Sequence, residues 1–149
     1  MDKRVAALKN PEDCLRFIKN ALNAGREDLV QQARQRRVIL LAEATDAKNE
    51  AERDAYAVLY AYEETLLQKH GKKMRATYTR RMIKELGILP AVERAVNKPT
   101  ETVGYKALQE MGLQSFSFEA VVLKYPELFS KEATARCLER INNAVHLSR

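Results

Sequence analysis

Apolar residues recur at helical spacing along most of the chain, between residues that typically begin or end helices. Asn10, followed by Pro11 and two acids, predicts a helix start, and Gly25 predicts its end. A second helix is expected from about 26 to 44. No run alternates apolar and polar residues between hairpin signals, so strands are not expected. The segment VVLKY at 121–125 is the one stretch that also fits a strand.

A third helix is expected from Thr45 or Asp46 to His70, with Gly71 directly after its end. At 1.5 Å per residue it would be about 37 Å long. Its middle, AYAVLYAY at 55–62, is apolar nearly all round. This pattern is typical of a helix that is buried on most sides or shared with a second subunit.

Shorter helices follow, and their expected bounds are about 77–86 ended by Gly87, about 90–97 from Pro90, 101–111 capped by Thr100, 117–124 from Ser115 or Ser117, and Ser130 to about 146. The chain therefore predicts an all-α fold. We expect a compact multi-helix bundle with one long central helix at about 46–70 and several short C-terminal helices. The 149 residues fit a single domain, which can be divided into an N-terminal helical region (1–70) and a C-terminal region of short helices (71–149).

The net charge of +6 is concentrated in one short segment. Residues 1–45, 46–68, 69–84 and 85–149 carry +3, −4, +7 and 0, so the chain without 69–84 would carry −1. The segment KHGKKMRATYTRRMIK at 69–84 holds seven lysines and arginines and no acid. A local basic patch of this kind indicates an anionic partner.

The start of the helix at 77 also differs from the other expected helix starts. Those carry acids, which the helix dipole favours by about 0.3–1 kcal/mol each; they are Glu12 and Asp13, Glu27 and Asp28, Asp46, Glu101, Glu119 and Glu132. The helix that opens at Ala76-Thr77 carries only cations in and before its first turns. An anion bound there would reverse this unfavourable balance, and the amide groups of a helix start suit phosphate.

These patterns predict a non-catalytic protein that binds nucleic acid, DNA rather than RNA and double-stranded, through 69–84. Tyr78, Met82, Ile83 and Leu86 are expected to pack inward, with the cations outward. The 71–76 turn and the 77–86 helix fit a helix-turn-helix unit, and a second phasing uses Gly87 and the 90–97 helix. The residues expected to contact nucleic acid are Lys69, Lys72, Lys73, Arg75, Thr77, Tyr78, Thr79, Arg80, Arg81 and Lys84.

Four alternatives stay open. The basic segment can be a solvated face paired with the acids of 46–68, which include Glu50, Glu52, Asp54, Glu63 and Glu64. The protein can instead be a helical adaptor or regulator that binds a protein partner or forms a homodimer through 55–62. The Arg34–Arg37 cluster can extend the phosphate footprint or lie on a solvent face, and Tyr56, Tyr60 and Tyr62 can stack on bases or pack in the core.

Other classes of chemistry have little support in the sequence. His70 and His146 have no metal-ligand spacing, and no phosphate-binding loop or serine elbow occurs, so neither a cofactor nor a metal is expected. Asp46 and Lys48 share a spacing found in some nucleases, but Asp46 also fits a helix cap. No apolar run is long enough to predict a membrane span or a signal peptide, and Cys14 and Cys137 are expected as buried thiols in a cytoplasmic protein.

Overall fold

The computed structural model describes residues 1–98 and 105–147, with side chains for 1–98 and 106–143. The described chain is all-α and contains no strand. The helices are α1 (Lys3–Ala6), α2 (Pro11–Asn23), α3 (Glu27–Glu43), α4 (Glu50–His70), α5 (Thr77–Leu86), α6 (Ile88–Val96), α7 (Tyr105–Glu110), α8 (Phe118–Lys124) and α9 (Lys131–Leu147), with a 3₁₀ turn, η1 (Pro126–Leu128).

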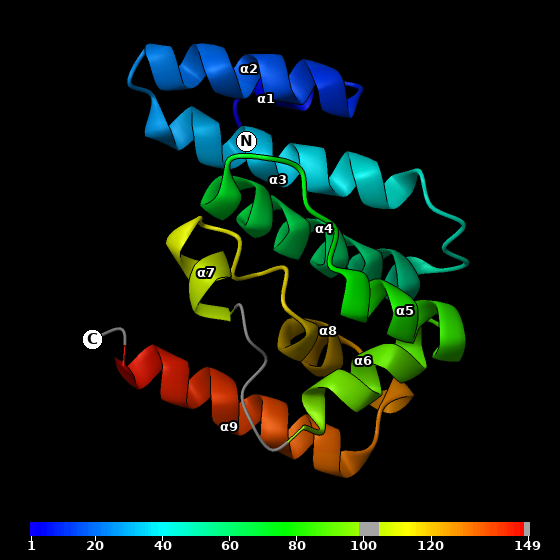
Figure 1. The fold of residues 1–149 in the computed structure, drawn as a ribbon. Coiled ribbons are helices and arrows are strands. Elements are labelled where there is room, and N and C mark those ends of the chain that lie inside the picture. The colour runs from blue at the N-terminus through cyan, green and yellow to red at the C-terminus, as the bar shows by residue number, and fades with distance from the viewer. Residues whose placement is uncertain (99–104, 148–149) are drawn as a thin grey trace.

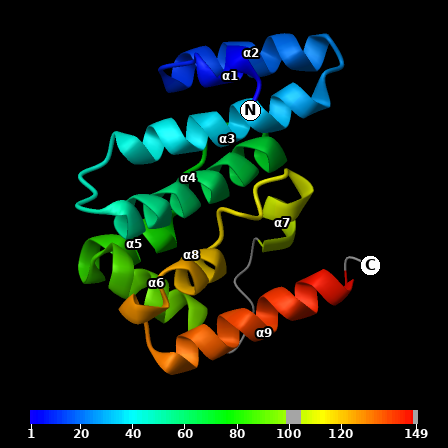
Figure 2. The ribbon, with the colours of Figure 1, turned by 180° about the vertical axis from the view of Figure 1, so that it is seen from behind.

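The helices are stacked in layers around α4. In Figure 1 α2 lies on α3, α3 lies on α4, and α7, α8 and α6 follow below α4, with α9 at the opposite edge from α2. The view from behind in Figure 2 shows the same order of layers. The helix α4 therefore contacts helices on both sides of the molecule, from both regions of the chain that the sequence divides at residue 70.

Two of the apolar clusters that hold these layers together include residues of α4. One joins α4 to α6, α8 and α9, and the other joins α4 to α3, α7 and the turn at Leu113. A third cluster joins α1, α2 and α3. The apolar run at 55–62 is thus used within one chain, since its most buried members, Ala55, Ala57, Val58, Leu59 and Ala61, have almost no exposed surface. The surface that would have served a second subunit is covered by neighbouring helices.

The prediction that the long helix starts at Thr45 or Asp46 is wrong, because α4 begins at Glu50. The Asn49 side chain accepts a hydrogen bond from the Glu52 amide and caps the helix. The Thr45 hydroxyl donates instead to the carbonyl of Ala42 at 2.6 Å, and so closes the preceding helix. Both residue types can cap a helix, and only the path of the chain decides which one does so.

Other boundaries are close to those expected. The helix α5 covers 77–86 as predicted, whereas α6 begins at Ile88 rather than Pro90, because Gly87 at φ 91° ends one helix and begins the next. Pro90 then occupies the first turn, where its missing N–H costs nothing. Ser117 caps α8, which takes in most of the ambiguous VVLKY stretch as helix. Thr100, the expected cap of the 101–111 helix, lies outside the described residues.

Both cysteines are free and buried, as expected. Burial raises the pKa of the Cys137 thiol to about 12. None of the helices in the described ranges has the length and apolar character needed to cross a lipid bilayer.

We expect Leu113→Ala to lower the free energy of unfolding by about 2–5 kcal/mol, because Leu113 is fully buried and alanine would leave a cavity between α3, α4 and α7. Leu138 is 52% exposed on α9. Leu138→Ala should therefore change the free energy by less than about 0.5 kcal/mol. Urea denaturation of both variants checks this, and equal losses would contradict the assignment of Leu113 to the core.

Candidate nucleic-acid interface

The basic segment 69–84 spans the end of α4, a turn and the whole of α5 except its last two residues. Gly71, at φ 71°, ends α4 in the left-handed conformation that glycine adopts without strain. The chain at 71–76 then runs back along α4, on the near side of the molecule in Figure 1. As a result α5 begins opposite the middle of α4 rather than beyond its end.

A carboxylate of the protein itself occupies the start of α5. Glu63 Oε2 accepts hydrogen bonds from the Ala76 amide at 2.8 Å and from Arg80 Nε at 2.6 Å, and Arg80 Nη2 donates to Oε1 at 2.7 Å. The Glu63 side chain is only 13% exposed. The first turn of α5 contains no acid, as expected, but the expectation that the helix start needs an external anion is wrong, because Glu63 of α4 supplies the negative charge.

The Glu63 contacts also change the role of Arg80. The hydrogen bond to Glu63 raises the pKa of the Arg80 guanidinium, which also lies 5.7 Å from the centre of the Tyr60 ring. Both ends of the Glu63 carboxylate are held in a bidentate pair. A phosphate contact from Arg80 would have to replace this pair, so Arg80 ties α5 to α4 in the described structure.

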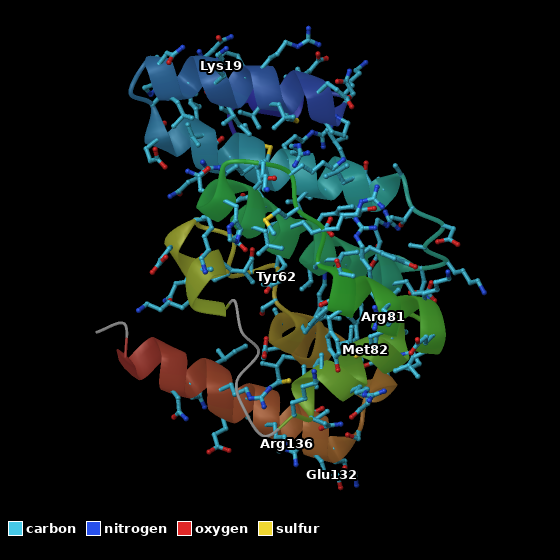
Figure 3. The ribbon with its side chains drawn as sticks, viewed as in Figure 1. Lys19, Tyr62, Arg81, Met82, Glu132 and Arg136 are labelled. Atoms are coloured by element: carbon cyan, nitrogen blue, oxygen red, sulfur yellow. The ribbon has the colours of Figure 1, made fainter. Side chains whose placement is uncertain are left out.

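The other six cations of the segment are exposed, and no carboxylate of the described residues forms an ion pair with them. Figure 3 shows one of them, Arg81, beside the buried Met82 on α5. Together they form what we call the basic surface: Lys69, Lys72, Lys73, Arg75, Arg81 and Lys84.

Most acids of 46–68 that were candidates to neutralise this surface are engaged elsewhere. Glu64 pairs with Arg37 at 2.6 Å, and Asp54 Oδ2 accepts from Lys124 Nζ at 2.9 Å. The Glu52 side chain accepts from the Lys48 amide. Among the acids that the structure describes, only Glu63 pairs with a cation of 69–84, so the alternative of a neutralised face holds for one of its seven cations.

The predicted inward face of α5 is only partly correct. Met82 is buried and Ile83 is half-buried, but Tyr78 is 58% exposed and Leu86 also lies at the surface. Lys98 Nζ lies 4.3 Å from the centre of the Tyr78 ring and donates to its hydroxyl at 3.2 Å, which lowers the Tyr78 pKa. The short helix packs chiefly on α6 through its middle, so its first and last apolar residues extend beyond that contact. Thr77 is exposed and Thr79 is half-buried at the same helix start.

The arginines at 34–37 lie between elements of the fold. Arg34 is 6% exposed and donates to Gln68 at 3.2 Å, Arg36 donates to the Leu8 carbonyl at 3.0 Å, and Arg37 pairs with Glu64. They connect α3 to α4 and to the turn after α1. The cluster is therefore neither an extension of the basic surface nor a solvent face.

In the second helix-turn-helix phasing, α6 would face nucleic acid with Pro90 and Arg94, which are its exposed residues. Ile88, Ala91, Val92, Ala95 and Val96 of α6 are buried against α4, α5, α8 and α9. In the first phasing α5 presents Arg81 and Lys84 outward, although it packs on α6 rather than on the end of α4. Among the described residues no cluster of histidine, cysteine or acidic side chains could hold a metal ion.

We expect Glu63→Gln to lower the free energy of unfolding by about 1–3 kcal/mol, because Arg80 and the Ala76 amide would lose a charged acceptor. A double-mutant cycle with Arg80→Met, measured by urea denaturation, should give a coupling energy of about 1 kcal/mol or more. Additive effects of the two substitutions would show that the pair does not hold α5 in place.

Comparisons with protein families, with curated proteins and with solved structures found no match to this chain. No role is therefore carried over from another protein.

Proposed function

We propose that the protein binds nucleic acid through the basic surface, without catalysing a reaction on it. The observation that supports this proposal most directly is the set of six exposed cations with no carboxylate partner among the described residues. Lysine and arginine side chains in such a set contact phosphates and release the counterions bound to them. The exposed Tyr78, Thr77 and the half-buried Thr79 adjoin the same surface and would help to orient it.

Double-stranded DNA suits this surface better than double-stranded RNA does. The major groove of DNA admits a helix, whereas the major groove of RNA is too deep and narrow for side chains to read. The helix α5 presents Arg81 and Lys84 outward and is flanked by the cations of the 71–76 turn. We therefore propose that α5 approaches the groove while the turn follows the phosphate backbone.

The helix start contributes less to this proposal than the sequence alone indicated. Glu63 already supplies a negative charge to the Ala76 amide and to Arg80. We therefore base the proposal on side chains of the basic surface, and we leave the amide groups at the start of α5 out of it. Arg80 is treated as a residue that positions α5.

If phosphate contacts dominate, the affinity for duplex DNA should fall with salt at a log–log slope of about −0.9 per phosphate neutralised, or about −5 for six contacts. Fluorescence anisotropy with a labelled duplex at several salt concentrations measures this slope. The same titration with duplex RNA compares the two polymers. Absence of detectable binding at low salt would refute the proposal.

The triple variant Lys72→Glu, Lys73→Glu, Arg75→Glu should abolish measurable binding at moderate salt, because three cations would become anions within the basic surface. The matched control is Lys3→Glu, Lys9→Glu, Lys19→Glu, which makes the same change in net charge on exposed residues of α1, α2 and their connection. Figure 3 shows Lys19 on α2, across the molecule from Arg81. Equal loss in both triple variants would indicate an effect of net charge alone and would contradict a localised interface.

The alternative that the protein is an adaptor or homodimer is tested separately. The helix that prompted it is enclosed by α3, α6, α7 and α8, so its apolar surface offers no argument for a second subunit. Light scattering of the purified protein tests this alternative: a monomer would count against assembly through 55–62, whereas the nucleic-acid proposal holds for a monomer or a dimer.

A further inference from the structure

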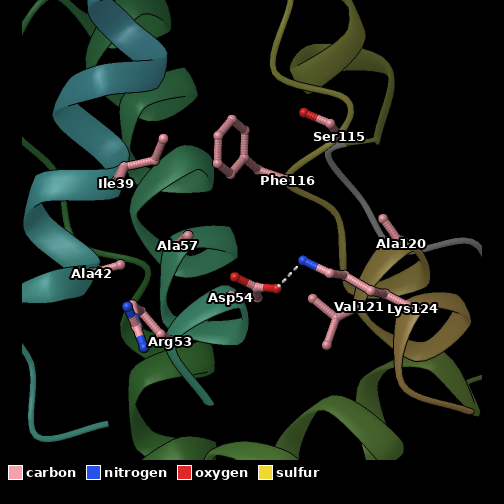
Figure 4. A pocket seen from close by; sticks show the side chains of 10 residues that line it. All are labelled: Ile39, Ala42, Arg53, Asp54, Ala57, Ser115, Phe116, Ala120, Val121 and Lys124. Carbon is pink, nitrogen blue, oxygen red and sulfur yellow. Dashed lines mark hydrogen bonds and ion pairs between the residues drawn. The ribbon is translucent and has the colours of Figure 1, made fainter. Parts of the chain in front are cut away.

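A cavity of about 220 Å³ lies between α3, α4, the segment at Ser115 and Phe116, and α8. Its walls are mostly apolar, and Figure 4 shows the ring of Phe116 with Ile39 on one side and Val121 and Ala120 on the other. The cavity involves no residue of the basic surface. It is therefore independent of the proposed nucleic-acid interface.

One edge of this cavity is charged. Arg53 and Lys124 are exposed, and Asp54 lies between them in Figure 4. Asp54 Oδ2 accepts from Lys124 Nζ at 2.9 Å and from Tyr125 Oη at 2.7 Å. Both bonds use the same oxygen, so within the described residues Oδ1 keeps its acceptor positions open. The Arg53 side chain forms no hydrogen bond or ion pair with the described residues, so its five N–H donors are also open.

The size of the cavity fits a small ligand. An apolar cavity of about 150 Å³ holds a benzene molecule, whereas pockets for drug-sized ligands measure about 300–1,000 Å³. A volume of about 220 Å³ therefore matches one large aliphatic or aromatic side chain. The ligand need not be larger than a single amino acid.

The charges at the edge of the cavity further restrict the class of ligand that it can bind. A simple carboxylic acid would pair with Arg53 and Lys124 but would be repelled by Asp54. A simple amine would pair with Asp54 but would be repelled by Arg53 and Lys124. A zwitterion satisfies both signs at once. We propose that the cavity binds a free amino acid with a large apolar side chain, whose ammonium group donates to Asp54 Oδ1 and whose carboxylate accepts from Arg53 and Lys124.

The test is a titration of the full chain, labelled with ¹⁵N, with L-leucine and with L-phenylalanine, followed by chemical shifts of the amides around the cavity. Saturable shifts centred on Phe116 and Val121 are expected, with affinity in the millimolar range or tighter. L-leucinamide lacks the carboxylate and N-acetyl-L-leucine lacks the ammonium group. Each should bind about tenfold more weakly than leucine.

Two pairs of variants, each a test and a matched control, show whether the ligand binds in the cavity. Asp54→Asn keeps the shape of the side chain and should weaken leucine binding about tenfold, whereas Glu50→Gln, an exposed neighbour on α4, should leave it unchanged. Ala120→Phe should fill the cavity and remove the shifts, while Ala135→Phe, at an exposed position of α9, should keep them. Thermal unfolding of each variant confirms that it is folded.

Three outcomes would overturn the proposal. These are absence of saturable shifts with millimolar leucine and phenylalanine, equal binding of leucine and its two blocked forms, and binding that survives in folded Ala120→Phe. Because none of these measurements uses nucleic acid or the basic surface, their failure leaves the proposed function untouched, and the reverse also holds.

Discussion

The enclosure of α4 is the constraint on which the rest of the structure depends. Its alanines, Ala51, Ala55, Ala57 and Ala61, are small enough to let helices on opposite sides approach its backbone closely. A helix surrounded in this way has little room for unpaired charge. Its acids therefore reach out to separate neighbours: Glu64 to α3, Glu63 to α5 and Asp54 to α8. Each acid fixes one neighbouring helix against the central one.

This arrangement links the two charge segments that the sequence places side by side. Two acids of 46–68, Asp54 and Glu64, are held by partners from distant regions of the chain, and only Glu63 meets the basic segment that follows. The six cations of the basic surface are consequently left exposed. The positive charge of that surface thus follows from the packing of α4. Acids of α4 that pair with neighbouring helices are not available to pair with the adjacent lysines and arginines.

Local signals in the sequence predicted the fold class and most helix ends, because caps such as Asn10, Gly71, Gly87 and Ser117 act within a few residues of themselves. Features that depend on residues far apart in the chain could not be predicted from these local signals. Glu63 lies 13 residues before the amide that it caps, and the exposure of Tyr78 depends on where α6 contacts α5. The charged edge at Asp54 and Lys124 joins residues 70 apart in the chain, and no spacing rule connects them. Helical periodicity also placed the Arg34–Arg37 cluster on a surface, since it carries no information on how a long side chain spans an interhelical gap.

The return of the 71–76 turn along α4 separates the charge of this protein from its stability. The turn contributes Ala76 to the buried interior, while its lysines and arginine point into solvent and support no packing. Substitutions that add or remove charge in this turn should therefore affect what the surface binds more than they affect the stability of the fold. The isoelectric point of this scaffold can therefore be changed at the turn without changing the helices that pack in its core.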